Sequence, residues 1–217
     1  MTTRAAKVWQ AAERYGRLCA LLAALAASLN AGPALAKSRL DQQNRDAGGA
    51  GFGVSVSATP FLGQTFTAGL TGKLDRIGVV LEPNTSDKLP TGTIFAEIYP
   101  TDADGLPDTA ADPLGSGSVA STKIPGPPAG VTRIRLSHPA AVVKGTRYAI
   151  VLHTDEPVHG VYSWFGSTAF PNGDQYPRGD AGERTGANGS WALQPGADFY
   201  FQTYVAVRRG HHRHRHR

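Results

Sequence analysis

GTIFAEIY, at residues 92–99, alternates two kinds of side chain with a period of two. In an extended strand, Ile94, Ala96 and Ile98 therefore share one apolar face. The opposite face carries Phe95, Glu97 and Tyr99. VTRIRLS, at residues 131–137, follows the same rule, because its two arginines alternate with Thr, Ile and Leu. Both segments predict strands that bury one side and expose the other.

Similar runs recur along the chain and are separated by Gly, Pro, Asp and Asn, which is typical of strands joined by turns. We predict strands at 63–68, 73–82, 92–99, 117–124, 131–137, 147–153, 160–165 and 198–207. Asn188-Gly189 predicts a tight hairpin, because both residue types tolerate positive φ. Eight or more antiparallel strands without crossover helices predict an all-β fold, a two-sheet antiparallel β-sandwich of jelly-roll type.

Residues 1–36 have the parts of a secretory signal peptide. Four basic residues precede an apolar run at 18–29, and the small-residue triplet Ala34-Leu35-Ala36 follows it. The run is 12 residues long, whereas a membrane-spanning helix needs about 20. We therefore expect cleavage near Ala36, a secreted or periplasmic product and no transmembrane anchor.

The remaining chain divides by composition. Residues 37–60 are rich in Gly and are interpreted as a linker with a possible edge strand, 61–207 as the β-sandwich domain, and 208–217 as a disordered basic tail. The single cysteine, Cys19, lies in the leader, so the exported chain has no thiol. Residues 37–207 hold 13 basic and 16 acidic side chains, a net charge of −3. This balance argues against specific nucleic-acid binding by the domain.

Seven motifs follow one another through residues 40–205. They are LDQQN (40–44), GQTFTAGLTGKLDRIGVVL (63–81), DADGLPD (102–108), GTRYAIVL (145–152), YSWFGS (162–167), GSWAL (189–193) and DFYFQTYV (198–205). In this order they resemble a family of bacterial secreted β-sandwich modules, mostly of uncharacterised function, found alone or attached to surface and cell-wall proteins. That family is similar in outline to carbohydrate-binding jelly rolls. The resemblance implies a jelly-roll fold, and its strand and turn motifs define no catalytic set.

Three carboxylates surround a glycine turn in residues 102–108: Asp102, Asp104 and Asp108. Calcium takes six to eight oxygen ligands, and alternate side chains of a tight loop supply several of them. The twelfth position of a hand-type site is Pro113 rather than glutamate, so Asp112 is a substitute ligand only. The alternative is a polar hairpin that uses Asp, Gly and Pro for its turn alone.

Four aromatic residues are candidate glycan-binding residues: Tyr162, Trp164, Tyr176 and Trp191. Flat rings stack on the C–H faces of sugars, but the same rings pack well inside a sandwich. Tyr162 and Trp164 have the same parity and so share one face of their strand. We expect at least one tryptophan to lie in the core, because large aromatic side chains are usually well buried.

Catalytic arrangements are weakly represented. His153, Asp155 and His159 are candidates for a metal or acid/base site, but no H-E-x-x-H or G-x-S-x-G motif accompanies them. Carboxylates for glycoside hydrolysis are available in any sandwich of this size. The sequence therefore favours a protein that is not an enzyme.

The tail RRGHHRHRHR, at residues 208–217, has five arginines and four histidines. The histidines are His211, His212, His214 and His216. Neutral imidazoles chelate Zn, Ni or Cu, and arginines bind anionic polymers or membrane head groups. The alternative is a solvated end without a selected role.

Three hypotheses follow for the function. The first is an exported, non-enzymatic binding or adhesion module that recognises a glycan or surface polymer. The second is an inert structural sandwich whose His/Arg tail binds metal or an anionic cell-surface polymer. The third, an extracellular hydrolase, has the least support.

Overall fold

A computed structural model describes residues 37–45, 52–56, 61–83, 91–126, 128–155, 162–168, 173–186 and 189–207. The predicted leader (1–36) and basic tail (208–217) lie outside these residues. The strands are β1 (Ser38–Asn44), β2 (Phe52–Val56), β3 (Phe61–Thr67), β4 (Gly72–Pro83), β5 (Thr93–Pro100), β6 (Gly115–Ala120), β7 (Gly130–Val142), β8 (Arg147–Thr154), β9 (Tyr162–Ser167), β10 (Ala181–Arg184), β11 (Trp191–Gln194), β12 (Asp198–Phe199) and β13 (Phe201–Ala206). A short 3₁₀ helix, η1, covers Ser121–Lys123.

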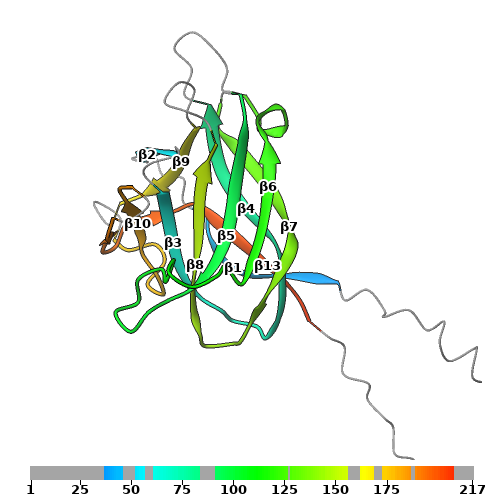
Figure 1. The fold of residues 1–217 in the computed structure, drawn as a ribbon, viewed down its shortest axis with the longest axis vertical. Coiled ribbons are helices and arrows are strands. Elements are labelled where there is room, and N and C mark those ends of the chain that lie inside the picture. The colour runs from blue at the N-terminus through cyan, green and yellow to red at the C-terminus, as the bar shows by residue number, and fades with distance from the viewer. Residues whose placement is uncertain are drawn as a thin grey trace, which may run out of the picture. The chain divides into compact units, whose positions relative to one another are not determined.

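The strands form one curled antiparallel sheet in the order β1-β13-β4-β7-β6-β5-β8-β3-β10-β11 (Figure 1). β9 pairs with β4, β2 and β12 beside this path. β7 pairs with β4 along one edge and with β6 along the other, so it joins two half-sheets. The first half-sheet contains β1, β13, β4, β9, β2 and β12, and the second contains β6, β5, β8, β3, β10 and β11. The expected all-β antiparallel architecture is confirmed.

The period-two pattern gives the core between the half-sheets. Ile94, Ala96 and Ile98 of β5 are fully buried, as are the inward residues of the neighbouring strands. The Phe66 ring of β3 contacts the Phe201 ring of β13, with centroids 6.2 Å apart. This contact crosses from one half-sheet to the other. Among the described residues, none belong to a helix with the length and apolar character needed to cross a membrane.

Residues 37–60 contain two strands where the composition predicts a linker with a possible edge strand. β1 pairs with β13 at the edge of the first half-sheet, and the Asn44 side chain donates a hydrogen bond to the Phe199 carbonyl at 3.2 Å. β2 pairs with β9, and its Val56 is fully buried. The glycine-rich composition therefore overlaps strands whose partners lie more than 100 residues away along the chain.

The prediction that a strand continues to residue 124 is wrong, because residues 121–123 form the 3₁₀ helix η1 instead. β6 stops at Ala120, which pairs with Thr93, the first residue of β5. Beyond this pair the Ser121 N–H donates to the Gly92 carbonyl at 3.0 Å, and the chain then turns into η1, where the Ile124 N–H donates to the Ser121 carbonyl at 3.0 Å. β10 and β11 do form an antiparallel hairpin, although Asn188 of its predicted turn lies outside the described residues.

Candidate functional site

The four candidate aromatic residues have different environments. Trp164 is fully buried, so its predicted role in surface glycan binding is wrong. Its ring stacks on Phe199 at a centroid distance of 4.3 Å and an angle of 12°, and its Nε1 donates to the Tyr200 carbonyl at 2.9 Å. β9 turns this side chain inward because the strand lies between β2 and β4, whose apolar residues face the same interior.

Tyr176 is also a core residue rather than a surface ligand-binding residue. Its ring meets Phe201 edge to face at 4.9 Å, and its hydroxyl donates to Gln42 Oε1 at 3.0 Å. Burial raises the pKa of Tyr176 to about 12. Tyr176 therefore fixes the 173–180 segment against β1 and β13.

Trp191 lies on the outer face of the second half-sheet and is half-buried. Its ring rests on Gly63 of β3, where an added Cβ would come within 2.8 Å of Cζ3. Only glycine leaves room for this close approach of ring to backbone. The indole N–H points to Thr109 Oγ1, 3.4 Å away, in the connection between β5 and β6.

Trp191 belongs to a larger group on this outer face. The aromatic face, as we name it, consists of Phe61, Phe95, Glu97, Tyr99, His153, Arg184 and Trp191. His153 stacks on Phe95 at 5.1 Å and 15°, and it also contacts Phe61 at 5.1 Å. The Arg184 guanidinium carbon lies 4.6 Å from the Phe61 centroid and 5.6 Å from that of Trp191. Five rings thus lie on the side of the sheet that faces away from the core.

Glu97 supplies the negative charge of the aromatic face. Its Oε2 lies 3.6 Å from His153 Nε2 and accepts a hydrogen bond from the Tyr99 hydroxyl at 2.8 Å. His153, together with the Tyr99 hydroxyl, holds the pKa of Glu97 below its usual value against the opposing effect of burial. Burial and the neighbouring Glu97 carboxylate raise the pKa of Tyr99. Glu97 is therefore an ionised acceptor at neutral pH.

Arg184 supplies the positive charge. Its Nη1 donates to Thr109 Oγ1 at 2.6 Å, while its Nε is buried and has no hydrogen-bond partner among the described residues. A buried N–H without a partner costs stability, so Arg184 is held in this position by its other contacts, to Thr109, Phe61 and Trp191. The arrangement therefore offers ring faces, a carboxylate and a guanidinium side by side.

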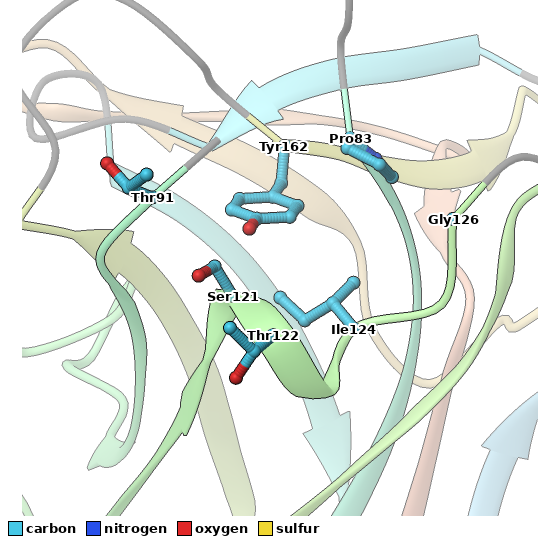
Figure 2. Close-up of a pocket in the computed structure, with 7 residues that line it drawn as sticks. All are labelled: Pro83, Thr91, Ser121, Thr122, Ile124, Gly126 and Tyr162. Atoms are coloured by element: carbon cyan, nitrogen blue, oxygen red, sulfur yellow. The ribbon is translucent and has the colours of Figure 1, made fainter. Parts of the chain in front are cut away.

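A pocket of about 330 Å³ opens where β4 ends and β5 and β9 begin (Figure 2). It is lined by Pro83, Thr91, Ser121, Thr122, Ile124, Gly126 and Tyr162. Figure 2 shows the Tyr162 ring on one side and Ser121, Thr122 and Ile124 on the other. Tyr162 is buried within β9, yet its ring reaches this pocket. The lining residues that the structure describes are uncharged and suit a small neutral ligand, and the volume is at the lower end for ligand pockets, about 300–1,000 Å³.

The predicted calcium ligands lie in the connection between β5 and β6. Asp102 Oδ1 accepts hydrogen bonds from the backbone N–H groups of Asp104 and Leu106, at 3.0 and 2.9 Å. This geometry is that of an Asx turn, and it uses the Asp102 carboxylate locally. Asp104 is exposed and Asp108 is half-buried.

Within the described residues, no three or more His, Cys, Asp or Glu side chains are grouped to hold a metal ion. The tail histidines 211, 212, 214 and 216 lie outside these residues. So does His159, whereas Asp155 accepts a hydrogen bond from the Thr93 N–H at 2.8 Å and His153 turns toward Glu97. His153, near the end of β8, and Asp155, just after it, therefore contact different neighbours.

Sequence reasoning missed two residues of the aromatic face, Phe61 and Arg184, and did not bring the others together. The alternation in 92–99 does place Phe95, Glu97 and Tyr99 on one side, and this part is confirmed. Phe61 and Arg184 carried no sequence signal, because they meet only through the pairing of β3 with β10. The available clue to this face was the presence of rings at outward positions of two predicted strands, Phe95 and Tyr99 in 92–99 and His153 in 147–153.

No protein-family model matches this chain, and no curated protein is significantly similar to it in sequence.

Proposed function

We propose that this protein is an exported, non-enzymatic binding module that recognises a glycan on its aromatic face. The observation that carries the proposal is the group of five rings on the outward side of the second half-sheet, with Glu97 and Arg184 among them. Tyr99 is buried at the base of this group, whereas Phe61, Phe95, His153 and Trp191 are half-buried and leave part of their surface open to a partner.

The chemistry of the aromatic face suits a sugar chain better than an apolar partner. Trp191 and Phe61 present rings, and aromatic rings bind partners that have one apolar and one polar side. Glu97 accepts hydrogen bonds from hydroxyl groups, and Arg184 donates to ring or hydroxyl oxygens. Specific small-molecule sites combine apolar contact area with a few placed polar groups in the same way.

We also propose a fold type and a cellular location for this protein. The curled antiparallel sheet is assigned to the jelly-roll type of β-sandwich, and lectin domains are among the proteins built on that architecture. The leader at 1–36 is assigned as a signal peptide cleaved near Ala36, which gives a secreted or periplasmic bacterial protein.

A glycan array that compares the wild-type chain with Trp191→Ala tests the proposal. We expect a defined set of neutral glycans to bind the wild type and to lose at least tenfold in affinity in the variant, as for a central aromatic contact. Tyr204→Ala, which removes a half-buried ring from the other half-sheet, is the matched control. Equal loss in both variants, or no glycan bound by the wild type, would contradict the proposal.

Gly63→Ala provides an independent variant that keeps the tryptophan. Its methyl group would meet the Trp191 ring at 2.8 Å and displace it from the sheet. We expect weaker glycan binding with the indole still present. Deletion of Gly210–Arg217 distinguishes the alternative hypothesis, because complete loss of binding on this deletion would assign recognition to the tail.

Two metal hypotheses accompany the proposal. Calcium at Asp102, Asp104 and Asp108 is tested by a thermal melt with and without a chelator, since a ligand that binds only the folded state raises the melting temperature. Zn, Ni or Cu at the tail histidines is tested by titrating each metal into the full chain and the tail-deleted chain. A shared response of both chains would exclude the tail as the metal site.

A further inference from the structure

The outer face of the first half-sheet has a basic patch that the net charge of −3 for residues 37–207 conceals. Three neighbouring strands, β13, β4 and β7, align their outward residues in two rows. The first row is Tyr204, Arg76 and Arg135, and the second is Gln202, Gly78 and Arg133. We name these six residues the arginine face. Directly opposed residues of paired strands point to the same side, so the three guanidinium groups gather on one surface.

The outward orientation follows from the burial of the alternate residues. Ile77 of β4 pairs with Ile134 of β7, and both are fully buried in the core. Arg133 and Arg135 flank Ile134 and are exposed. The arginine face is therefore separate from the aromatic face, which belongs to the other half-sheet.

Arg76 and Arg135 are directly opposed across the strand pair. Like charges in this position destabilise a sheet, because the two Cβ atoms are only about 5 Å apart. Among the described residues, no carboxylate lies within ion-pair distance of Arg76, Arg133 or Arg135, since the one such pair is Glu97 with His153. The positive charges of the arginine face are thus not neutralised by this part of the chain.

Arg76 is held in place rather than left to move in solvent. Its guanidinium carbon lies 4.4 Å from the centroid of the Tyr204 ring, and its Nε is buried without a hydrogen-bond partner. Tyr204 is itself fixed, because its hydroxyl donates to Gln202 Oε1 at 2.8 Å. A stacked guanidinium that loses little freedom on binding is well suited to a planar or tetrahedral anion.

Gly78 leaves the centre of the second row without a side chain. A Cβ at this position would lie 3.2 Å from Gln202 Oε1 and 3.5 Å from Val131 Cγ1. Gly78 is itself buried beside the Gln202 side chain, with Arg133 opposite it on β7 and Arg76 in the adjoining row.

We infer that the arginine face binds an anionic polysaccharide, with a sulfate or carboxylate group held between Arg76 and Arg133. Guanidinium groups bind such anions through two parallel N–H···O bonds. Arg135 extends the positive surface along β4 and β7 to a second anionic group of the same chain. The site does not depend on glycan binding at the aromatic face, so each proposal can fail separately.

Salt-dependent binding to immobilised heparin, a sulfated polysaccharide, tests the inference, and polygalacturonate provides the carboxylated counterpart. The full chain is used at pH 8, where the tail histidines are neutral and the tail contributes equally to every variant. We expect Arg133→Gln/Arg135→Gln to bind about tenfold more weakly at 0.15 M salt and with a reduced salt dependence. Lys123→Gln/Lys144→Gln removes the same charge from exposed sites elsewhere and should change binding little.

A pair of variants at Gly78 separates the local site from general charge. Gly78→Asp places a carboxylate between the arginines, and Gly78→Asn has the same shape without the charge. We expect Gly78→Asp to lose heparin binding by at least tenfold relative to Gly78→Asn and to melt at a higher temperature. Trp191→Ala should leave heparin binding unchanged.

Three outcomes would overturn the inference. The first is equal weakening by the arginine and lysine double variants, and the second is equal heparin binding by the two Gly78 variants. The third is competition by duplex DNA as strong as that by heparin at equal charge concentration, which would reduce the arginine face to a non-selective polyanion surface.

Discussion

Two tryptophans of this protein, Trp164 and Trp191, occupy opposite environments. Trp164 is fully buried between β2 and β4, where its ring stacks on Phe199. Trp191 lies half-buried on the outer face of a short hairpin and rests on Gly63. Both follow a small residue in a glycine-containing strand motif, YSWFGS and GSWAL. The local sequence around an aromatic residue therefore does not determine whether it packs in the core or lies on the outer face of the sheet.

The difference comes from the neighbouring strands. β9 has β2 on one side and β4 on the other, so its inward face meets the interior. β11 pairs only with β10 among the described strands, and its Trp191 position corresponds to Arg184 on the outward side. A central strand offers its large residue a core, whereas an edge hairpin offers it the sheet surface.

The largest effect is expected from Trp164→Ala. Removing the ring leaves a cavity beside Phe199 and a carbonyl of Tyr200 without its donor. Loss of a fully buried aromatic side chain lowers the free energy of unfolding by about 3–5 kcal/mol. Urea denaturation followed by circular dichroism measures it. A loss no larger than that of Trp191→Ala would end the distinction between the two tryptophans.

The interior also contains a buried carboxylate, Asp198, which precedes Phe199. Its Oδ1 accepts from Gln64 Nε2 and its Oδ2 from the Tyr176 N–H, both at 2.9 Å. Burial, together with the nearby carboxylates of Asp174 and Asp180, raises the pKa of Asp198 to about 7 against the lowering effect of the hydrogen bonds from Gln64 and Tyr176.

Since the pKa of Asp198 is higher in the folded state than in the unfolded state, the folded protein binds the proton more tightly. Stability should therefore be greatest below about pH 4 for this group and fall as the pH rises from about 4 to 7. We expect the melting temperature to drop by roughly 5 °C between pH 5 and pH 8. Asp198→Asn should remove most of this drop, and an unchanged slope in the variant would assign it to other groups.

Trp191→Ala should have a smaller effect on stability than on binding. The ring is half-buried and its N–H makes only a long contact with Thr109. We expect a loss of about 1 kcal/mol in the free energy of unfolding, which is common for a single substitution. Chemical denaturation of the same samples used for the glycan array provides the measurement. A loss as large as 3 kcal/mol would make Trp191 a structural residue.

The smallest effect on stability is expected at Asp102, in the connection between β5 and β6 that also contains Thr109. Asp102→Asn keeps the acceptor oxygen for the Asp104 and Leu106 N–H groups, whereas Asp102→Ala removes it. We expect Asp102→Asn to melt within about 1 °C of the wild type and Asp102→Ala to melt roughly 3 °C lower. Equal losses that appear only when calcium is present would instead support the calcium hypothesis.

The candidate sites were predictable only in part. The alternation in 92–99 identifies Glu97 and its two aromatic neighbours as companions on one face, and the alternation in 131–137 does the same for Arg133 and Arg135. What the patterns lack is the partner strand. Arg76 joins the two arginines only through the register of β4 with β7, and Gly63 lies under Trp191 only through β10.

The sequence by itself determined the all-β architecture, because a period of two is a local property that every strand carries in its own residues. It also determined which residues of a strand share a face. Only the tertiary structure decided which aromatic rings lie inside and which charges gather outside. Strand pairing joins residues far apart in the chain, so Trp164 and Trp191 received different surroundings from strands that their own sequence does not specify.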